Sequence, residues 1–231
     1  MTSKIPMLSI IVPCLNEAEG IAGTLAALAP LRARGAEVIV VDGGSSDGTA
    51  ERAAPHADCV VSAPRGRALQ MNAGAARARG EILLFLHADT LLPEAADALI
   101  VDGLKRSRRG WGRFDVAISG ANPLLRVVAC LMNVRSRLTG IATGDQAIFA
   151  TRSLFTAAGG YPEIALMEDI ALSRQLKRFG APLCLRHRLI ASGRRWEKHG
   201  VVRTILLMWR LRLAYWLGAD PGKLAAHYDR G

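Results

Sequence analysis

The spacing of apolar residues in the first half of the chain predicts short strands that alternate with longer helices. Each apolar run is flanked by polar or glycine-rich residues, and the Ala-rich segments between the runs have helical periodicity. This alternation is typical of βαβ units, so we expect an α/β fold in which helices flank a mainly parallel sheet. The predicted strands are 8–12, 37–41, 59–62 and 81–86, and the predicted helices are about 17–30, 47–54, 66–79 and 93–106.

The start of the first helix is predicted from Asn16, with Glu19 three residues later in the manner of a capping box. After residue 110 the alternation weakens. There we expect strands at 114–118 and 146–150, a short strand pair near 183–192, and helices near 122–138, 168–179 and 201–217.

The length of 231 residues fits one main domain with an appendage. We expect a domain over 1–200 that consists of two halves, at about 1–110 and about 111–200. Residues 201–231 are expected to form an amphipathic helical segment, because apolar residues there are interrupted by Arg203, Arg210 and Arg212.

The formal net charge of +10 predicts an anionic partner, such as a diphosphate, an anionic membrane or a nucleic acid. Four scattered cysteines without paired spacing argue against a zinc site or a disulfide framework and fit a reducing cytoplasm. The N-terminus is too short and polar for a signal peptide, and no stretch of about 18 uncharged apolar residues occurs. We therefore expect a cytoplasmic protein.

Polar clusters follow three of the predicted strands, at residues 13–17, 42–49 and 87–90. Ligands of open α/β sheets bind outside the carboxyl ends of the strands, so these clusters predict the binding site. Asp42, directly after a strand, is the predicted contact for a ribose or a base. Asp47 fits a turn or helix-cap role equally well. The first strand-to-helix turn lacks G-x-G-x-x-G, which argues against a dinucleotide site.

The segment from His87 to Asp89 places two potential metal ligands two residues apart after an apolar strand. Asp89 offers a hard oxygen for a divalent cation, and His87 would shift the preference from Mg²⁺ toward Mn²⁺. Alternatively, His87 is a histidine at a strand end that bonds to a neighbour.

These segments resemble the family 2 glycosyltransferases in order and spacing, over roughly residues 8–200. The resemblance implies a GT-A fold with a nucleotide-binding half at about 1–110 and an acceptor half at about 111–200. It also implies a nucleotide-diphosphate sugar donor, a hydroxyl or carboxyl acceptor and no nucleic-acid partner. The matching segments are residues 9–17, 41–49, 72–81, 87–89, 159–163 and 167–169.

The resemblance also implies roles for individual residues. Asp89 would coordinate Mn²⁺ or Mg²⁺, although His87 stands where the family usually has an aspartate, which leaves the metal's identity open. Asp169 matches the general base of inverting members, whereas Glu168 and Asp169 could instead simply favour a helix N-terminus. The nucleotide pocket would consist of Pro13, Asn16, Glu17 and Asp42, with Arg67 as a base or phosphate contact.

A segment near residue 195 is similar to the Gln-x-x-Arg-Trp motif of some relatives, with Ser192 in place of the glutamine. Arg195, and Arg194 by proximity, would contact the diphosphate. Trp196 would stack beside an acceptor, or belong to the core. Asp145 lies where relatives shape the acceptor site, and Glu168 would join it there.

The apolar, arginine-containing helices at 122–138 and 201–217 favour a peripheral membrane enzyme with a lipid-like acceptor, although two core-packing helices would show the same pattern. The segments at 87–90 and 143–149 also resemble a subgroup of small bacterial enzymes associated with glycosylating lipids such as carotenoid acids, or with arsenosugar formation.

Two other functional classes are weighed against this one. A sugar nucleotidyltransferase would place a glycine-rich basic loop after the first strand, where this chain has residues 13–17. A non-catalytic nucleotide-binding or anionic-surface-binding module would give no reason for Glu168 and Asp169.

Overall fold

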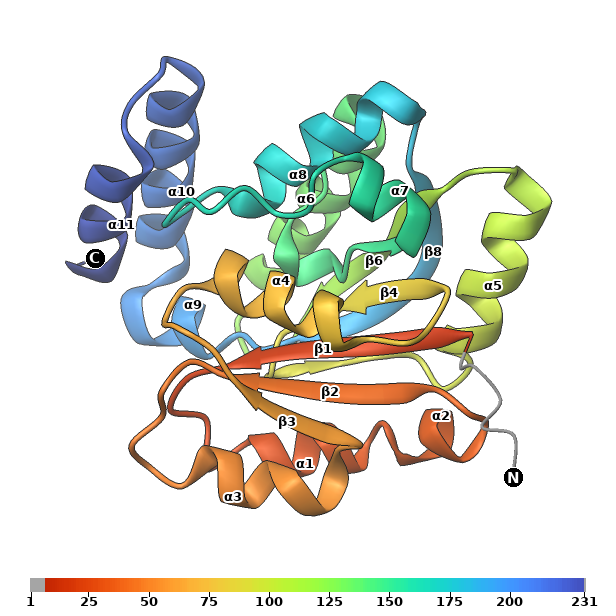
Figure 1. Ribbon diagram of the computed structural model, residues 1–231. Helices are drawn as coiled ribbons and strands as arrows, with labels where there is room; N and C mark the ends of the chain where they lie inside the picture. Colours follow the sequence, from red (N-terminus) through yellow and green to blue (C-terminus); the bar gives the residue numbers. More distant parts are fainter. Residues whose placement is uncertain (1–6, 231) are drawn as a thin grey trace, which may run out of the picture.

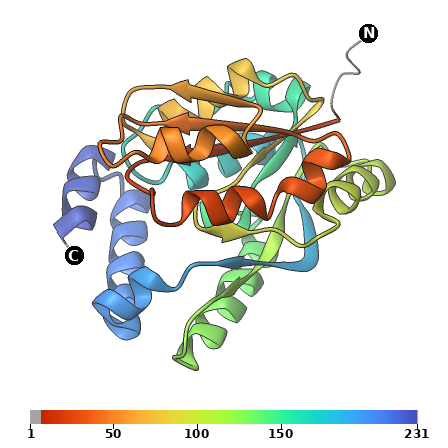
Figure 2. The ribbon, with the colours of Figure 1, turned by 90° about the horizontal axis from the view of Figure 1, so that it is seen from below.

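An eight-stranded sheet runs through the computed structural model, which describes residues 7–230, and helices cover both of its faces (Figures 1 and 2). The strand order is β3-β2-β1-β4-β7-β6-β8-β5. The strands are β1 (Leu8–Cys14), β2 (Glu37–Asp42), β3 (Cys59–Ser62), β4 (Ile82–Phe85), β5 (Thr90–Leu91), β6 (Trp111–Ile118), β7 (Phe149–Thr151) and β8 (Leu183–Ala191).

The first half of the sheet is parallel, as the sequence predicts. β1 pairs in parallel with β2 and β4, and β2 with β3. The second half is mixed: β7 is antiparallel to β4 and β6, β8 is parallel to β6, and the short β5 is antiparallel to β8. Cys14 lies opposite Asp42, so β1 and β2 end at the same edge.

Apolar residues of the central strands are buried on both faces of the sheet, which explains their continuous hydrophobic runs. In β1, Ile10 and Val12 pack with Leu25 of one helical layer, whereas Ile11 packs with Met71 of the other. The longer helices are α1 (Ile21–Ala26), α2 (Ala29–Ala33), α3 (Thr49–Ala53), α4 (Arg67–Arg77), α5 (Ala96–Ser107), α6 (Leu124–Thr139), α7 (Arg152–Ala157), α8 (Glu168–Leu176), α9 (Arg194–His199), α10 (Val201–Trp216) and α11 (Pro221–Arg230).

Several predicted element boundaries are wrong. The first helix begins at Ile21 rather than at Asn16, because Asn16 has a left-handed backbone (φ 53°) and its side chain accepts a hydrogen bond from the amide of Ser46. The predicted strand pair near 183–192 is the single strand β8, which follows β6 past a bulge. The strand expected from Gln146 begins at Phe149, after a 3₁₀ turn.

Helix α4 lies unusually close to the sheet. A Cβ atom at Gly74 would come within 2.4 Å of Ile11 Cγ2, so only glycine allows this approach. Nearby, Asn72 donates to the carbonyl of Tyr161 at 2.8 Å and accepts from its amide at 2.9 Å. Two segments that are far apart in the sequence are therefore joined beneath the site.

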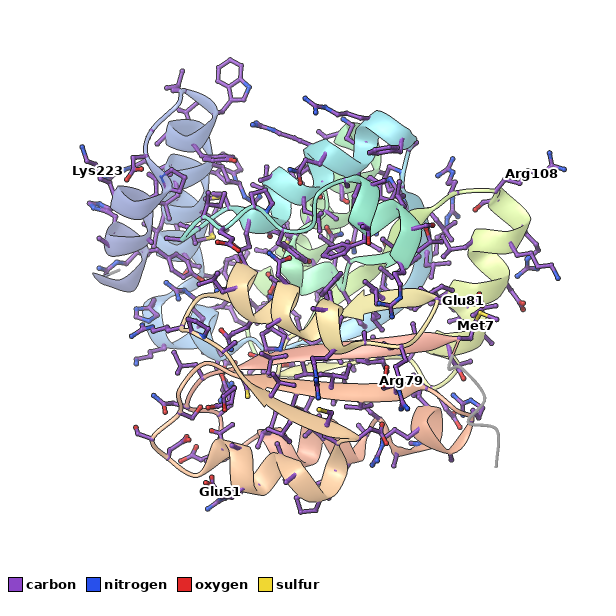
Figure 3. The ribbon with its side chains drawn as sticks, viewed as in Figure 1. Met7, Glu51, Arg79, Glu81, Arg108 and Lys223 are labelled. Carbon is purple, nitrogen blue, oxygen red and sulfur yellow. The ribbon has the colours of Figure 1, made fainter. Side chains whose placement is uncertain are left out.

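Glu37 anchors the amino edge of the sheet, where Figure 3 labels Met7, Arg79 and Glu81. Its buried carboxylate accepts hydrogen bonds from the hydroxyl of Ser9 at 2.5 Å, the amide of Arg79 at 2.8 Å and Nε of Arg79 at 2.7 Å. Burial alone would raise the pKa of Glu37, but these hydrogen bonds and the charge of Arg79 hold it below its ordinary value of 4.5.

We expect Glu37→Gln to lower the free energy of unfolding by about 2 kcal/mol at neutral pH, because a buried carboxylate loses its charge-assisted bonds. The folded pKa is depressed, so this contribution is complete above the unfolded value of 4.5 and is lost as pH falls through the folded pKa. Urea unfolding at several pH values measures both effects. The exposed Glu81→Gln on the same edge is the control, and an equal loss in both variants would contradict the prediction.

Helix α6 is fastened to β6 by polar side chains on its inner face. Asn133 donates to the carbonyl of Val116 and accepts from its amide, both at 2.9 Å, and Ser136 accepts from Nε of the buried Arg113 at 3.1 Å. The outer face carries the helix's apolar stripe, which is exposed to solvent. The stripe consists of Leu124, Val127, Leu131, Val134 and Leu138.

Helix α10 exposes a second stripe with the same spacing, and Figure 2 shows α6 and α10 next to each other on one side of the molecule. Trp209 and Trp216 are 64% and 70% exposed. These residues point away from the core, whereas other apolar residues of the two helices, such as Leu125 and Leu211, are buried in core clusters. Each helix therefore packs against the protein as the core-packing interpretation expects and also exposes an apolar stripe. The stripe on α10 consists of Val202, Leu206, Trp209, Leu213 and Trp216. Within residues 7–230, every helix is too short or too polar to span a bilayer.

Candidate active site

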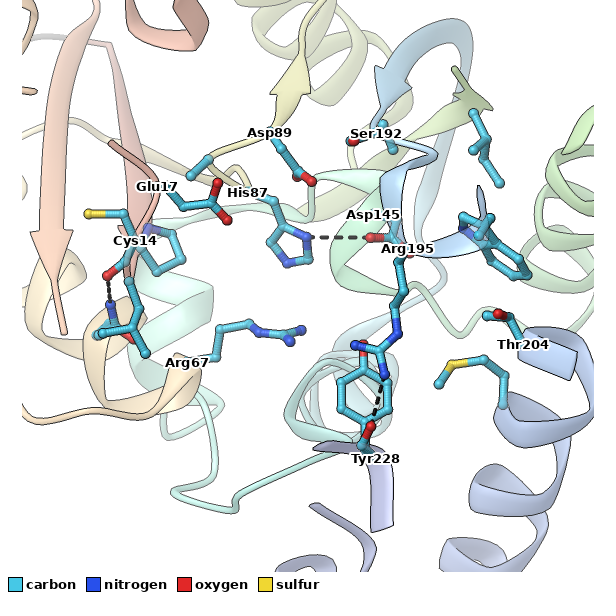
Figure 4. A pocket seen from close by; sticks show the side chains of 18 residues that line it. Cys14, Glu17, Arg67, His87, Asp89, Asp145, Ser192, Arg195, Thr204 and Tyr228 are labelled. Atoms are coloured by element: carbon cyan, nitrogen blue, oxygen red, sulfur yellow. Dashed lines mark hydrogen bonds and ion pairs between the residues drawn. The ribbon is translucent and has the colours of Figure 1, made fainter. Parts of the chain in front are cut away.

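A pocket of about 380 Å³ opens at the carboxyl edge of the parallel strands, where the sequence predicts a ligand. Figure 4 shows acidic and basic side chains from separate loops facing this space. The lining residues include Pro13, Cys14, Leu15 and Glu17 after β1, His87 and Asp89 after β4, Asp145 before β7, Ser192, Arg195 and Trp196 after β8, and Arg67, Gln70, Met208 and Tyr228 from helices.

Two of the predicted nucleotide contacts hold loops together and do not line this pocket. Asp42 accepts hydrogen bonds from the amides of Gly44 at 3.0 Å and Ser45 at 2.9 Å. The side-chain oxygen of Asn16 accepts a hydrogen bond from the amide of Ser46. The backbone amide of Asn16 donates a hydrogen bond to the hydroxyl of Ser45 at 2.9 Å. These bonds give the loops after β1 and β2 a fixed shape beside the pocket. Asp47 also serves this loop, because its carboxylate accepts from the amides of Ala18 and Thr49.

Arg194, which does not itself line the pocket, bridges two carboxylates that do. Its Nη2 lies 3.0 Å from Oε2 of Glu17 and 3.5 Å from Oδ2 of Asp89. Glu17 and Asp89 follow different strands, so one guanidinium from the start of α9 joins the ends of β1 and β4. The three side chains lie together, and the single positive charge of Arg194 offsets only one of the two carboxylates, so the cluster can still attract a cation.

His87 faces Asp145 rather than solvent. Its Nδ1 lies 3.4 Å from Oδ1 of Asp145, drawn as a dashed line in Figure 4, and the ring packs so closely on Gly144 that a Cβ there would lie 2.3 Å from Nε2. Burial raises the pKa of Asp145, but the hydrogen bond from His87 and the charges of His87, Arg67 and Arg212 outweigh it and lower the pKa. This contact matches the alternative in which the histidine bonds to a neighbour.

The chemistry of the acids fits a metal ion that arrives with its substrate. Among the side chains of residues 7–228, no three of His, Cys, Asp or Glu converge as a complete metal site. Asp89 does present a partly exposed carboxylate to the pocket. One carboxylate with substrate phosphates is a common arrangement for Mg²⁺, and Mn²⁺ tolerates the same ligands.

Asp169 and Glu168 begin α8 behind the loop that carries Asp145. Asp169 Oδ2 accepts the amide of Gly144 at 2.9 Å, and Glu168 Oε1 lies 3.6 Å from Nη1 of Arg67. Neither acid is among the residues that line the pocket, although Arg67 and Asp145 are. Burial and the charge of Asp169 raise the pKa of Glu168, and Arg67 opposes this shift.

The far wall of the pocket comes from the C-terminal helices. The guanidinium carbon of Arg195 lies 3.6 Å from the ring centre of Tyr228, and Nη2 donates to the carbonyl of Tyr228 at 2.9 Å. Sequence reasoning missed Tyr228, because nothing in the pattern of α11 indicates that it returns to the site. It also missed Gln70, whose Nε2 donates to the carbonyls of Cys14 at 2.8 Å and Val41 at 2.9 Å.

Cys14 lies in the pocket but is not suited to nucleophilic attack. Burial, followed by the charge of Asp42, raises the pKa of its thiol to about 12, so the thiol is protonated at neutral pH. The chemistry of the site therefore rests on its carboxylates and arginines.

A second cavity, of about 340 Å³, adjoins the pocket and lies between α6 and α10. We call it the α6–α10 groove. Asp145, Trp196 and Met208 line both spaces, so Trp196 stands between them. The groove is lined by Val128, Leu131, Met132, Arg135, Asp145, Trp196, Ile205, Met208, Trp209 and Arg212.

Comparison of sequences identifies one family. The sequence model described as Glycosyl transferase family 2 matches residues 9–124, half of the chain. Poly-beta-1,6-N-acetyl-D-glucosamine synthase of Staphylococcus epidermidis is 26% identical over 198 residues, which cover 74% of this chain and 46% of the synthase. The Staphylococcus aureus (strain COL) synthase is 29% identical over 193 residues, 73% of this chain and 45% of that protein. The chain thus spans about half the length of these relatives.

Solved structures share the fold. The mannosyltransferase PcManGT from Pyrobaculum calidifontis, in complex with GDP-Man and Mn²⁺, superimposes with a TM-score of 0.64 at 24% identity, covering 91% of this chain and 61% of that one. S. aureus TarS 1–349 in complex with UDP-GlcNAc superimposes with a TM-score of 0.64 at 18% identity, covering 80% and 58%. At these identities the likeness concerns the fold alone.

Proposed function

The chain belongs to glycosyl transferase family 2 and has the GT-A fold, and from this premise we propose that it moves a sugar, with inversion, from a UDP- or GDP-linked donor to a lipid-like acceptor. The observation that carries this proposal is the convergence of Glu17, Asp89 and Arg194 at the mouth of a pocket on the carboxyl edge of the sheet. An acid pair with an exposed guanidinium suits a ligand that carries both negative phosphates and a cation.

Donor binding is assigned to the loops that the structure holds together. Pro13 and Glu17 line the pocket, and Asn16 and Asp42 shape the adjoining loops, where we place the nucleoside. Arg67, Arg194 and Arg195 would contact the diphosphate, whose negative charge grows as the sugar leaves. Asp89 would hold the divalent cation, which when bound supplies further positive charge to the departing diphosphate. His87 could add a ligand only by giving up its contact with Asp145.

The general base is assigned to Asp169. The acceptor oxygen attacks the anomeric carbon, the bond from that carbon to the diphosphate oxygen breaks, and the acceptor proton passes to a carboxylate. Oδ2 of Asp169 already accepts a hydrogen bond from the backbone amide of Gly144. We propose that the acceptor hydroxyl approaches this same carboxylate when the 144–146 turn shifts, with Asp145 and Glu168 at the acceptor side and Trp196 beside the acceptor.

A lipid-like acceptor is supported by the two exposed apolar stripes. They flank the α6–α10 groove, which opens next to the donor pocket. Large exposed apolar patches mark contacts with membranes or partners. A helix pair lying on the lipid surface would deliver an acceptor to Trp196 without any segment crossing the bilayer.

The donor assignment is tested by incubating the purified protein with a panel of UDP- and GDP-sugars, with Mn²⁺, Mg²⁺ or EDTA. We expect slow metal-dependent hydrolysis of one donor class and binding of its nucleoside diphosphate. Release of pyrophosphate from a nucleoside triphosphate and a sugar 1-phosphate would instead identify a nucleotidyltransferase. Binding without turnover of any donor, in the presence of detergent-solubilised lipid acceptors, would favour a non-catalytic module.

Membrane contact is tested by flotation on vesicles that contain phosphatidylglycerol. We expect the protein to float at low salt, and Leu138→Gln with Trp216→Gln to reduce the floated fraction severalfold, because both side chains leave apolar surface in water. Phe179→Gln, which removes an exposed apolar residue away from both stripes, is the control. A wild-type protein that stays in the soluble fraction would refute the membrane contact.

A further inference from the structure

Two arginines line the α6–α10 groove, which is otherwise mainly apolar. Arg135 lies on α6 and Arg212 on α10, so the two side chains reach the groove from opposite walls. Most of their neighbours there are aliphatic or aromatic, such as Leu131 and Trp209. The amphipathic pattern of the two helices suggests that their arginines extend toward lipid head groups, but the side chains of Arg135 and Arg212 line the groove.

Two of the three guanidinium nitrogens of Arg135 are buried without a partner. Nε and Nη2 are inaccessible to solvent and form no hydrogen bond with any group of residues 7–228, whose side chains the structure describes. Arg212 likewise forms no ion pair within those residues. A buried donor without an acceptor is strongly destabilising, and a buried charge more so, hence such groups are usually paired in native proteins.

The surroundings of Arg135 carry excess positive charge. Burial, followed by the charge of Arg212, lowers the pKa of Arg135 to about 10, and the nearby carboxylates of Asp169 and Asp145 do not compensate. Asp145 is already paired with His87. Arg135 is still charged at neutral pH, so the groove contains two cations whose repulsion an anion would relieve.

We propose that the α6–α10 groove binds the acceptor as an anionic amphiphile, with its head group paired to Arg135 and Arg212 and its apolar chain running between the two exposed stripes. This inference rests on the proposed function, since it names the acceptor class for that site. A phosphate monoester carries more than one negative charge at neutral pH and accepts several hydrogen bonds, so two guanidinium groups can pair with it. The shared walls at Trp196 and Met208 place such a head group beside the donor pocket.

The test measures binding without sugar transfer. Trp196 and Trp209 line the groove, so intrinsic fluorescence reports its occupancy. We titrate dodecyl phosphate, dodecanoate and the neutral dodecyl maltoside, which have chains of twelve carbons, each below its micellar concentration. The anionic probes are expected to bind at least about tenfold more tightly than the neutral one, as charge-assisted pairing predicts. Either dodecyl phosphate or dodecanoate can bind more tightly than the other. Both results support the proposal, and the tighter probe identifies the preferred head group.

Arg135→Met and Arg212→Met, singly and together, keep the groove apolar. We expect the preference for anions to fall with each change and to vanish in the double variant. The melting temperature should not fall in Arg135→Met, because no internal partner is lost. Arg126→Met and Arg203→Met remove exposed arginines outside the groove and serve as matched controls. Equal affinity for neutral and anionic probes, or an anionic preference that survives in the double variant, overturns the proposal.

The outcome separates this inference from the proposed function. Donor binding is measured independently by the nucleotide-sugar panel. If the donor binds and the anionic preference is absent, only the acceptor class is wrong. If the anionic preference is present and no donor binds, the groove assignment stands and the transferase assignment fails.

Discussion

Replacing Asp169 by asparagine is expected to lower kcat by about 10²–10⁴-fold, the usual contribution of a positioned general base. The amide oxygen of asparagine can still accept the hydrogen bond from the amide of Gly144, so the loop that carries Asp145 should keep its shape. The amide group cannot take up the acceptor proton. Donor affinity should change little, because Asp169 does not line the donor pocket. Single-turnover transfer and nucleotide binding measure the two effects.

Asp145→Asn is the informative comparison, because Asp145 lies on the same loop and does line the pocket. If Asp145→Asn abolishes transfer while Asp169→Asn is active, the base is Asp145 and our assignment is wrong. Asp102→Asn changes an exposed carboxylate on α5 and controls for net charge. A loss of donor binding in Asp169→Asn would show a role in the shape of the site rather than in proton transfer.

Asp89→Ala is expected to lower kcat/KM by about 10²–10³-fold, in line with the loss of one electrostatic contact to a leaving group. Asp89 is the acid that we assign to the cation, and without it the metal loses its link to the protein and the diphosphate keeps only its contacts with arginines. The variant should bind the donor equally weakly with Mn²⁺ and with EDTA. Calorimetric titration of the nucleoside diphosphate, with and without the ion, measures this.

His87→Ala tests the departure from the family pattern. The histidine ring contacts Asp145 and Gly144, so we expect this variant to keep its metal dependence and to disturb the 144–146 turn. A wild-type protein that binds the donor equally well in Mn²⁺ and in EDTA would refute the metal assignment for Asp89.

The sequence predicts the parallel half of the sheet because its strands are buried on both faces and read as continuous apolar runs. It also predicts which loops meet, since parallel strands such as β1, β2 and β4 end at one edge. For this reason the sequence places Glu17 and Asp89 at one site, whereas Arg194, which follows β8, is assigned to it only through the resemblance to a family motif.

The remaining features depend on tertiary contacts that leave no local pattern. Asn16 looks like a helix cap, but the loop after β2 offers its side chain a competing partner in the amide of Ser46. Tyr228 reaches the pocket only because α11 folds back along α10. The roles of Arg135 and Arg212 depend on which way their helices turn, and an amphipathic pattern does not reveal that an apolar face points outward.

The exposed stripes of α6 and α10 also affect the association of protein molecules with one another in solution. Copies that meet through exposed leucines and tryptophans attract one another, whereas the net charge of +10 keeps copies apart. Salt screens that repulsion over about 10 Å at 0.1 M but leaves apolar attraction intact. We therefore expect the two apolar stripes to promote self-association as ionic strength rises, so that the solubility of the protein falls in concentrated salt.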